Sequence, residues 1–308
     1  MNPLRSTILA ASRSARVRTT VTSVRATRRV VDRFVAGATA SDALECVHRL
    51  TGEGLRATVD HLGEEVADTA GADATVEAYA SLLDALASKD LARGADVSVK
   101  LTALGLDVDR RGALDRARAV LAAARTAGAT MTVDMEHSAL TATTLEVVRE
   151  LRVEDPSVAA VLQAMLRRTE DDARALAAEG ARVRLCKGAY AEGADVAFQR
   201  RGEVDASYRR CLAVLMGAAC TPLVATHDPS MVTAALELAA AEGRDPKDFE
   251  VQMLLGVRPD EQRRLSSLGF TVRVYVPYGT EWWGYLTRRL AERPANLAFF
   301  LRAMSSRS

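Results

Sequence analysis

The chain has 308 residues, 48% of them hydrophobic, and its 41 basic and 40 acidic side chains leave a net charge of +1. This length and apolar content allow one large domain with a substantial core, and the balanced charge argues against a chain that binds polyanions over its whole surface. No apolar run approaches the roughly 18 residues that a membrane-spanning helix needs.

The cysteines and histidines point to neither a disulfide framework nor a zinc site. The four cysteines include no C-x-x-C pair, and the four histidines are scattered at positions 48, 61, 137 and 227. Reduced thiols in a cytoplasmic protein without a bound metal are the simplest interpretation.

The N-terminal region is rich in arginine. Residues 1–36 carry eight arginines and a single acid, Asp32, and residues 6–50 read mostly as helix. Three interpretations remain open: an amphipathic helix packed on the rest of the chain, an arm that contacts anionic lipid, and a transit peptide. We expect an N-terminal helical arm over residues 1–54 and a second domain over residues 55–308.

Eight short apolar runs follow, and each ends in, or carries, a polar side chain. The runs are 57–62, 97–101, 131–135, 158–163, 183–187, 223–227, 250–255 and 272–276. Their polar members are His61, Lys100, Asp134, Gln163, Arg184 with Lys187, His227, Gln252 and Tyr275. The second and third runs and the last alternate clearly and predict strands, whereas 57–62 and 250–255 are also compatible with helical turns.

Helix-compatible segments separate and follow these runs. They are 74–93, 112–127, 140–151, 168–179, 194–219, 229–242, 258–268, 280–291 and 295–304. Gly128, Gly180, Gly243 and Gly269 stand where a C-terminal cap is expected, and Pro259 or Asp260 would open the short helix before the last strand. Repeated strand–helix alternation predicts an α/β fold, a (βα)8 TIM barrel with an N-terminal helical extension, whose polar strand ends meet at one mouth.

The most specific local feature is the pair Arg288 and Arg289 on the helix after the last strand. Two guanidinium groups can grip one carboxylate from different sides. Tyr285 lies one turn earlier, and Glu292 lies four residues after Arg288. The alternative is an ordinary helix with a surface pair between Arg288 and Glu292, which contributes a few tenths of a kcal/mol.

A second basic feature follows the fifth strand. Arg184 and Lys187 precede Gly188, and a glycine beside a cation lets a backbone approach a phosphate closely. The alternative is a basic strand end neutralised by Asp134 or Glu250.

Three other arrangements are weaker. Asp134, Glu136 and His137 could form a partial metal site, although an inward-facing Asp134 fits the pattern better. Lys100 could form a Schiff base or simply pair with Asp134 on a neighbouring strand. His227 could be structural or functional, and no G-x-G-x-x-G or P-loop motif indicates a Rossmann or P-loop nucleotide domain.

Taken together and in order, the motifs resemble the proline dehydrogenase family of flavin enzymes. The resemblance runs from about residue 55 to 302 and rests on VSVKLTALG, VDME, LQA, VRLCKGAY, ATHDP, EVQMLLGV, RVYVPYG and YLTRRLAER. It implies a distorted (βα)8 barrel that binds FAD at the strand C-termini.

The resemblance also implies roles for particular residues. Arg288 and Arg289 match the pair that holds the proline carboxylate. Positions that line or brace the proline pocket are matched by Lys100, Asp134, Tyr190, Tyr275, Tyr285 and Glu292. Flavin-contacting positions are matched by Met135, Gln163, Arg184, Lys187, Gly188, Ala189, Thr226 and His227. Asp134 and Arg184 are the residues expected to serve catalysis.

The chain departs from the family pattern at two positions. Ala191 stands where many members have Trp, and Asp228 stands where an Asn often follows the Thr-His pair. The sequence ends at residue 308 without the aldehyde dehydrogenase half of fused relatives, so the product is expected to pass to a separate enzyme.

The resemblance implies oxidation of L-proline to 1-pyrroline-5-carboxylate, by hydride transfer from ring carbon C5 to FAD. Electrons would pass to a membrane quinone during peripheral contact with the inner membrane face. Arg184, if close to the flavin, would stabilise its reduced form, and Asp134 would hold Lys100 or an arginine in place.

Three rivals remain open. A folate-type flavin reductase would run hydride out of the flavin, and a Schiff-base lyase would use Lys100 or Lys187. A nucleic-acid or membrane-binding module would use the arginine-rich first 36 residues, but nucleic-acid binding is not expected because no aromatic residues are interleaved there for base stacking.

Overall fold

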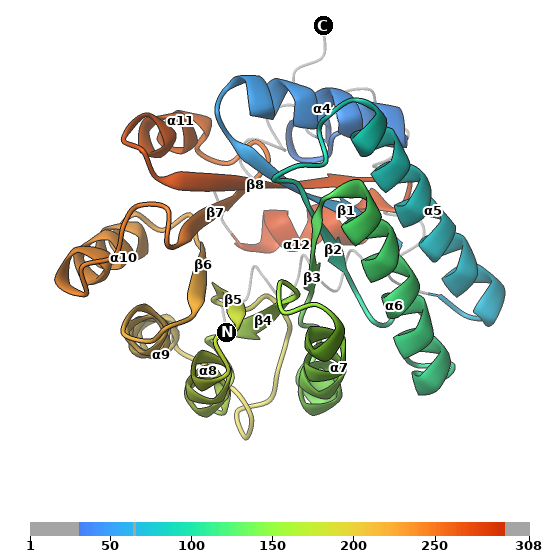
Figure 1. The fold of residues 1–308 in the computed structure, drawn as a ribbon. Helices are drawn as coiled ribbons and strands as arrows, with labels where there is room; N and C mark the ends of the chain where they lie inside the picture. Colours follow the sequence, from blue (N-terminus) through green and yellow to red (C-terminus); the bar gives the residue numbers. More distant parts are fainter. Residues whose placement is uncertain (1–30, 64–65, 293–308) are drawn as a thin grey trace, which may run out of the picture.

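Eight parallel strands form a closed barrel in sequence order, with β8 paired to β1 (Figure 1). The computed structural model describes residues 31–63 and 66–292, with side chains up to residue 287. The strands are β1 Arg56–His61, β2 Asp96–Val99, β3 Thr130–Val133, β4 Ala159–Gln163, β5 Arg182–Cys186, β6 Thr221–Ala225, β7 Glu250–Leu254 and β8 Thr271–Tyr278. All eight apolar runs are therefore strands, including the two that were also compatible with helical turns, and the (βα)8 prediction is confirmed.

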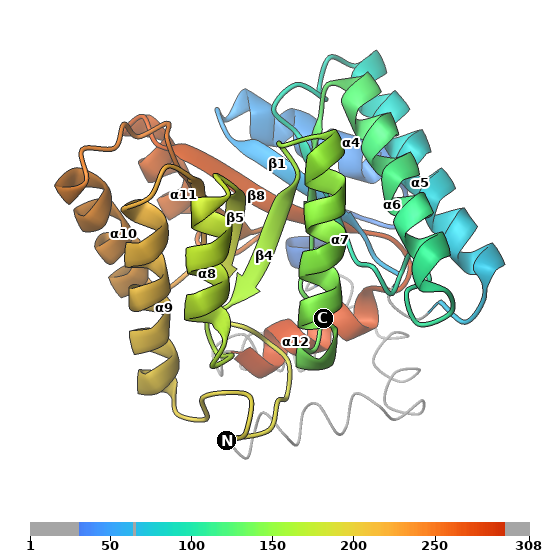
Figure 2. The same ribbon diagram turned by 60° about the horizontal axis from the view of Figure 1, so that its bottom comes forward.

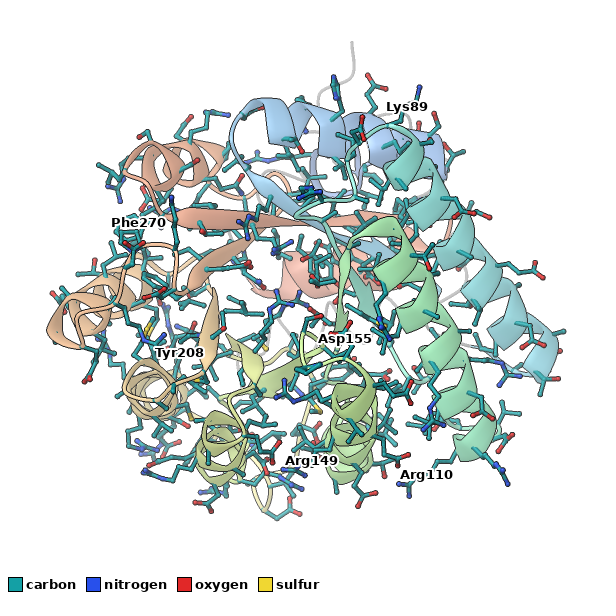
Figure 3. The ribbon with its side chains drawn as sticks, viewed as in Figure 1. Lys89, Arg110, Arg149, Asp155, Tyr208 and Phe270 are labelled. Carbon is teal, nitrogen blue, oxygen red and sulfur yellow. The ribbon has the colours of Figure 1, made fainter. Side chains whose placement is uncertain are left out.

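Helices cover the outside of the barrel (Figure 1). They are α4 Ala40–Gly52, α5 Thr69–Ser88, α6 Arg110–Ala127, η1 Ser138–Leu140, α7 Thr141–Glu154, α8 Thr169–Ala178, α9 Arg201–Met216, α10 Pro229–Ala241 and α11 Pro259–Ser267. Tyr208 of α9 is buried against the sheet and donates a hydrogen bond to Leu185 O, at 3.2 Å. Arg110 and Arg149 lie on outer helix faces (Figure 3). The core thus lies mainly between the outward strand residues and the apolar faces of these helices.

Glycine and proline are found at the helix ends where the sequence predicts them. Gly128 ends α6 with φ of 82°, in the left-handed region that glycine adopts without strain. Pro259 occupies the first turn of α11, where its missing N–H is not needed. The side chain of Asp109 accepts hydrogen bonds from backbone N–H groups in the first turn of α6.

Two predicted helices have different limits in the structure. The helix expected at 74–93 begins at Thr69, because Asp68 caps it, and ends at Ser88. The helix expected at 194–219 begins only at Arg201. The preceding segment instead pairs with the chain after β4, through Arg167 N to Val196 O at 2.9 Å and Phe198 N to Met165 O at 2.8 Å.

The described part of the N-terminal region is not one continuous helix. Residues 31–34 are helical, and the chain then turns at Gly37, whose φ is 149°. A Cβ at that glycine would lie 2.5 Å from the side chain of Asp42, which caps the start of α4. Residues 1–30 and the helix expected at 295–304 lie outside the described residues, so the division at residue 54 and the role of the arm stay predictions.

The last helix, α12 Trp282–Glu292, lies across the C-terminal ends of the strands instead of beside β8 (Figure 2). Its buried Tyr285 and Leu286 pack with Leu62, which follows β1, and with Val31, Phe34 and Val35. This placement puts a helix over the mouth of the barrel. Within residues 31–63 and 66–292, no helix combines the length and the apolar character that crossing a membrane requires.

Candidate active site

Arg184 of β5 lies at the centre of the polar cluster inside the barrel. Its Nη1 is 2.8 Å from both Asp134 Oδ1 and Ser98 Oγ. The hydroxyl of Tyr275 donates to Asp134 Oδ2 at 2.8 Å, and the Arg184 guanidinium carbon lies 5.5 Å from the centre of the Tyr275 ring. Only 5% of Arg184 is exposed, so charge-assisted hydrogen bonds and a ring face hold a desolvated cation in place.

A second ionic cluster lies deeper in the barrel. Glu250 accepts hydrogen bonds from Arg273 at 2.6 and 2.8 Å, and Arg56 and Arg182 lie within 4.0 Å of it. Burial by itself would raise the pKa of Glu250, but Arg273 and Arg182 outweigh that effect and lower it to about 2. The carboxylate therefore belongs to a balanced buried network.

This network predicts a specific acid sensitivity. The folded-state pKa of Glu250 is about 2, below its ordinary 4.5, so its contribution to stability is complete above pH 4.5 and is lost as the pH falls towards 2. We expect the urea midpoint of the wild type to fall more steeply over this interval than that of Glu250→Gln. The matched control is Glu146→Gln, which removes an exposed partner of Arg110 and should keep the wild-type slope. Equal slopes for Glu250→Gln and the wild type would contradict the assignment.

Lys100 does not pair with Asp134, contrary to the sequence-based expectation. Its Nζ lies 2.9 Å from both carboxylate oxygens of Asp60, and Asp60 is 1% exposed. Burial raises the pKa of Asp60 to about 6, while Lys100 opposes the increase. Asp134 is already engaged by Arg184, Ser98 and Tyr275, so the nearer carboxylate on β1 takes the lysine.

His61 was expected at the mouth but faces outward. Successive strand residues point to opposite faces; Asp60 faces inward, so His61 packs against Tyr79 of α5, with ring centres 6.2 Å apart. Its backbone N–H also donates to Tyr79 Oη at 3.2 Å. His61 is therefore part of the outer layer.

Lys187 is held by carboxylates at the end of β5. It pairs with Asp205 of α9 and, at 2.8 Å, with Asp228. Asp228 also caps α10 by accepting from Ser230 N at 3.1 Å. Burial by itself would raise the pKa of Asp228, but Lys187 and Ser230 together lower it well below its usual range. The aspartate that departs from the family pattern therefore acts as both a cap and a counter-ion.

The other residues expected to contact the cofactor follow neighbouring strands. Gln163 ends β4 and donates to Glu136 O at 2.7 Å. Thr226 Oγ1 accepts from Asp228 N at 3.1 Å, and His227 Nε2 accepts from Leu254 N at 2.8 Å. His227 Nδ1 therefore carries the proton if the ring is neutral. Met135, two residues after the end of β3, is buried.

Gly188 and its neighbours continue the chain from Lys187. Gly188 has φ of 102°, and a Cβ there would lie 2.5 Å from Met165 Sδ, so only glycine fits this position without a shift. Tyr190 is half-buried and packs against the small cluster formed by Met165, Leu166 and Ala197. Ala189 lies between them and is partly exposed. Ala191, at the departure from the family pattern, is exposed.

Asp134, Glu136 and His137 do not converge, so the partial metal site is not formed. Asp134 faces Arg184, whereas Glu136 accepts from the backbone N–H and the hydroxyl of Thr102. His137 is exposed. Among the described side chains, no group of three or more His, Cys, Asp or Glu residues is placed to hold a metal ion.

The expected substrate-contacting residues lie partly beyond the described side chains. Tyr275 and Lys100 face the barrel interior, and Tyr285 of α12 is buried against the mouth. Arg288, Arg289 and Glu292 lie on the described backbone of α12, but their side chains are outside the described residues.

These positions divide the mouth into two arcs. The residues expected to contact a cofactor follow β3, β4, β5 and β6, which are consecutive in the barrel. The residues expected to line the substrate pocket lie on or after β2, β8 and α12, with Asp134 after β3 and Tyr190 after β5 as the exceptions. Arg184, Asp134 and Tyr275 join the two arcs.

Sequence reasoning missed Asp60 and Ser98 and gave no role to Gln252. Each faces the barrel interior and has a hydrogen bond to a residue of the cluster, Lys100 or Arg184. Strict alternation along β1 and β2, in which Thr58 and Asp60 share a face, as do Asp96 and Ser98, is the signal that could have found the first two.

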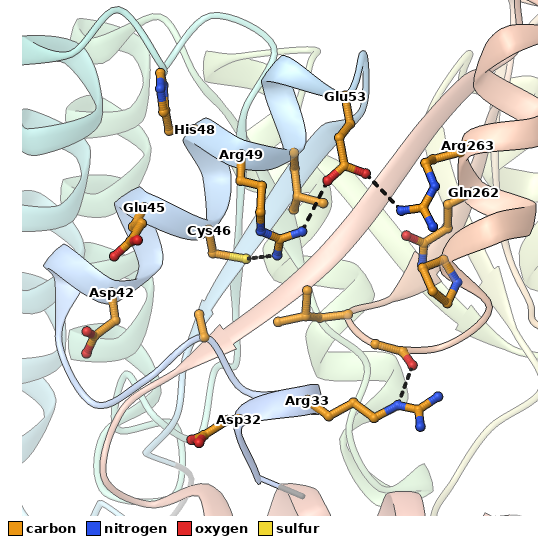
Figure 4. Close-up of a pocket in the computed structure, with 15 residues that line it drawn as sticks. Asp32, Arg33, Asp42, Glu45, Cys46, His48, Arg49, Glu53, Gln262 and Arg263 are labelled. Atoms are coloured by element: carbon orange, nitrogen blue, oxygen red, sulfur yellow. Dashed lines mark hydrogen bonds and ion pairs between the residues drawn. The ribbon is translucent and has the colours of Figure 1, made fainter. Parts of the chain in front are cut away.

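A separate groove of about 550 Å³ lies outside the barrel, between α4 and α11 (Figure 4). Glu53 joins Arg49 at 3.3 Å and Arg263 at 3.1 Å across it. Arg33 Nε donates to Gly256 O at 3.0 Å at its edge. These ion pairs neutralise much of its charge, and it is not continuous with the Arg184 cluster.

A closed (βα)8 barrel with a buried, charged cluster towards its strand C-termini defines an enzyme of the TIM-barrel class. The proline dehydrogenase family model matches residues 43–302 of the chain. The chain is 38% identical to proline dehydrogenase 1 of Bacillus subtilis, over 90% of this chain and 91% of that one. It is 35% identical to a proline dehydrogenase of Deinococcus radiodurans, over 89% and 90%. The chain belongs to the proline dehydrogenase family.

Solved structures of longer proteins share the fold. Proline utilization A of Bdellovibrio bacteriovorus, inactivated by N-propargylglycine, matches with a TM-score of 0.80 and 26% identity over 89% of this chain. The corresponding protein of Bradyrhizobium japonicum matches with a TM-score of 0.72 and 25% identity over 93%. This chain spans about a third of the length of each, 34% and 33%.

Proposed function

We propose that the enzyme oxidises L-proline to 1-pyrroline-5-carboxylate with FAD as the hydride acceptor and a quinone as the final acceptor. This is the first step of proline catabolism towards glutamate. The observation that carries the proposal is the Arg184–Asp134–Tyr275 cluster, which stands between an arc of cofactor-type residues and an arc of substrate-type residues.

The polar side chains on and after β4, β5 and β6 fit a flavin nucleotide. They combine the cations Arg184 and Lys187 with hydroxyl, amide and imidazole groups from Thr226, Gln163 and His227. Phosphate and the flavin ring edge both require such donors. When bound, FAD supplies the hydride acceptor. The protein's own contribution is a guanidinium group whose orientation is fixed, because Arg184 is held by hydrogen bonds on several sides.

The helix α12 supports the substrate half of the proposal. Tyr285 is buried over the mouth, and positions 288 and 289 follow it by three and four residues, the interval at which helix positions share a face. We assign Arg288 and Arg289 to the proline carboxylate, and Tyr190, Tyr275, Tyr285 and Glu292 to the walls of the pocket. Positioning of this kind contributes about 7–11 kcal/mol to lowering a barrier.

Both lysines of the site are engaged by carboxylates, which disfavours the Schiff-base alternative. Lys100 is held by Asp60 and Lys187 by Asp205 and Asp228. A Schiff-base lysine must be neutral to attack a carbonyl, and adjacent carboxylates favour the charged form.

The remaining partners are also part of the proposal. We place the enzyme in the cytoplasm with peripheral contact at the inner membrane face, where a quinone is accessible, and the product would go to a 1-pyrroline-5-carboxylate dehydrogenase. Membership of the family supports these assignments, and a membrane contact through the arginine-rich first 36 residues agrees with their charge.

A visible spectrum of the purified protein tests the proposal. We expect flavin absorbance bands that bleach when L-proline is added without oxygen, and that return when a soluble quinone is added. Bleaching by NADH but not by proline would instead identify a flavin reductase. A colourless protein that borohydride traps on a carbonyl substrate would identify a Schiff-base enzyme.

A further inference from the structure

We propose that Gln252 is a positioning residue that fixes the orientation of the Arg184 guanidinium and thereby sets the charge presented to the cofactor. The inference rests on the proposed function, because its consequence is felt by a bound flavin. Gln252 is 6% exposed and lies on β7, two strands from β5 in the barrel order.

The contact between the two side chains is short. Arg184 Nε donates to Gln252 Oε1 at 2.7 Å. Among the described side chains, this is the one hydrogen bond made by Nε, while the two terminal nitrogens serve Asp134, Ser98, Thr58 and Asp96. Because a guanidinium group is planar, fixing Nε together with the terminal nitrogens determines the rotation of the whole group.

The other hydrogen-bond partners of Arg184 lie on or directly after β1, β2 and β3. Thr58 is on β1, Asp96 and Ser98 are on β2, and Asp134 directly follows β3. Two of these are carboxylates, Asp134 at 2.8 Å and Asp96 at 3.4 Å, and they draw the cation towards the same wall of the barrel. Gln252 opposes this attraction from β7 without adding a negative charge.

The amide of Gln252 is itself held in one orientation. Its Nε2 donates to Glu250 Oε2 at 2.9 Å, and the other side of that carboxylate is held by Arg273. A flipped amide would place its oxygen against the Glu250 carboxylate and its NH2 group against the Arg184 N–H. The deep ionic cluster therefore orients Gln252, and Gln252 orients Arg184.

Losing the amide has a defined chemical consequence. It leaves a buried N–H of Arg184 without an acceptor and removes the restraint against Asp134 and Asp96. Reorientation of the guanidinium towards the two carboxylates weakens the positive field at a bound flavin, which disfavours its reduced form. Substrate binding depends on α12 and should be little affected.

The test compares Gln252→Met with Gln262→Met in the full-length holoenzyme. Gln262 is a matched control because it is also buried, at 3% exposure, and donates to Leu254 O and Val257 O outside the cluster. For Gln252→Met we expect bound flavin, anaerobic reduction by proline slowed about tenfold, a more negative flavin potential, and KM within about twofold. Gln262→Met should lower only the melting temperature.

Each result decides the question. A wild-type rate and potential in Gln252→Met, or equal losses in Gln262→Met, overturn the proposal. If Gln252→Met does not fold, Gln252→Asn, which keeps an amide one methylene shorter, should show the same slow reduction; if neither variant folds, the role is structural and the proposal is wrong. A wild-type protein whose flavin is not reduced by proline overturns the proposed function as well, and it is recognised before any variant is measured.

Discussion

Replacing Arg288 by methionine is expected to raise KM for proline by about 100-fold while FAD stays bound. A charge-assisted hydrogen-bonded contact with a carboxylate contributes about 1.5–3 kcal/mol, and every 1.4 kcal/mol corresponds to a factor of ten. The helix that carries Arg288 lies across the mouth and is anchored there by Tyr285 and Leu286. Steady-state kinetics with proline as the varied substrate, together with flavin absorbance, measure the effect.

Arg289→Met is expected to act in the same direction, and the double variant should lose nearly all carboxylate recognition. Arg149→Met is the control, since Arg149 lies on the outer face of α7, paired with Glu179 at 2.8 Å. An unchanged KM in both single variants would remove the carboxylate role. Loss of flavin in either would instead indicate that α12 supports the cofactor site.

Strand alternation explains why the barrel could be predicted from the sequence. Each run had either alternating or continuous apolar residues and was followed by a helix-compatible segment. Eight such strand–helix units in a row are compatible with few folds other than a parallel barrel. Boundaries were less predictable where tertiary pairing competes with helix propensity, as in the loop before Arg201, whose backbone bonds to residues 165–167.

The interior of the barrel was harder to predict, because one residue of register changes the face. Asp60 and His61 are adjacent polar residues at the end of β1. Alternation places them on opposite faces, and the structure shows that Asp60 is the inward one, where it binds Lys100. Likewise, the sequence cannot say whether the partner of Lys100 comes from β1 or β3, since both strands flank β2.

Removing the carboxylate of Asp60 is expected to have the largest effect on stability. Asp60→Asn should lower the free energy of unfolding at pH 7.5 by about 3–5 kcal/mol, because it breaks a buried ion pair from one side. Asp60 is 1% and Lys100 is 8% exposed, so water can do little to solvate the lysine that is left without its partner. The double variant Asp60→Leu/Lys100→Met should recover most of the stability but not the activity with proline, and urea denaturation beside kinetics separates the two.

Lys100→Met should behave differently from Asp60→Asn, because a carboxylate can escape burial by taking up a proton. Burial raises the pKa of Asp60 to about 6 even with Lys100 opposing it, and loss of the lysine raises that pKa further. A carboxyl group whose folded-state pKa lies above its unfolded value stabilises the fold at low pH and loses that contribution as the pH rises. The stability lost in Lys100→Met should therefore be small near pH 6 and grow towards pH 8.5. A loss that is constant across this range would mean that Asp60 stays ionised without its partner, and that the surrounding hydroxyl and amide groups, not the lysine, carry its charge.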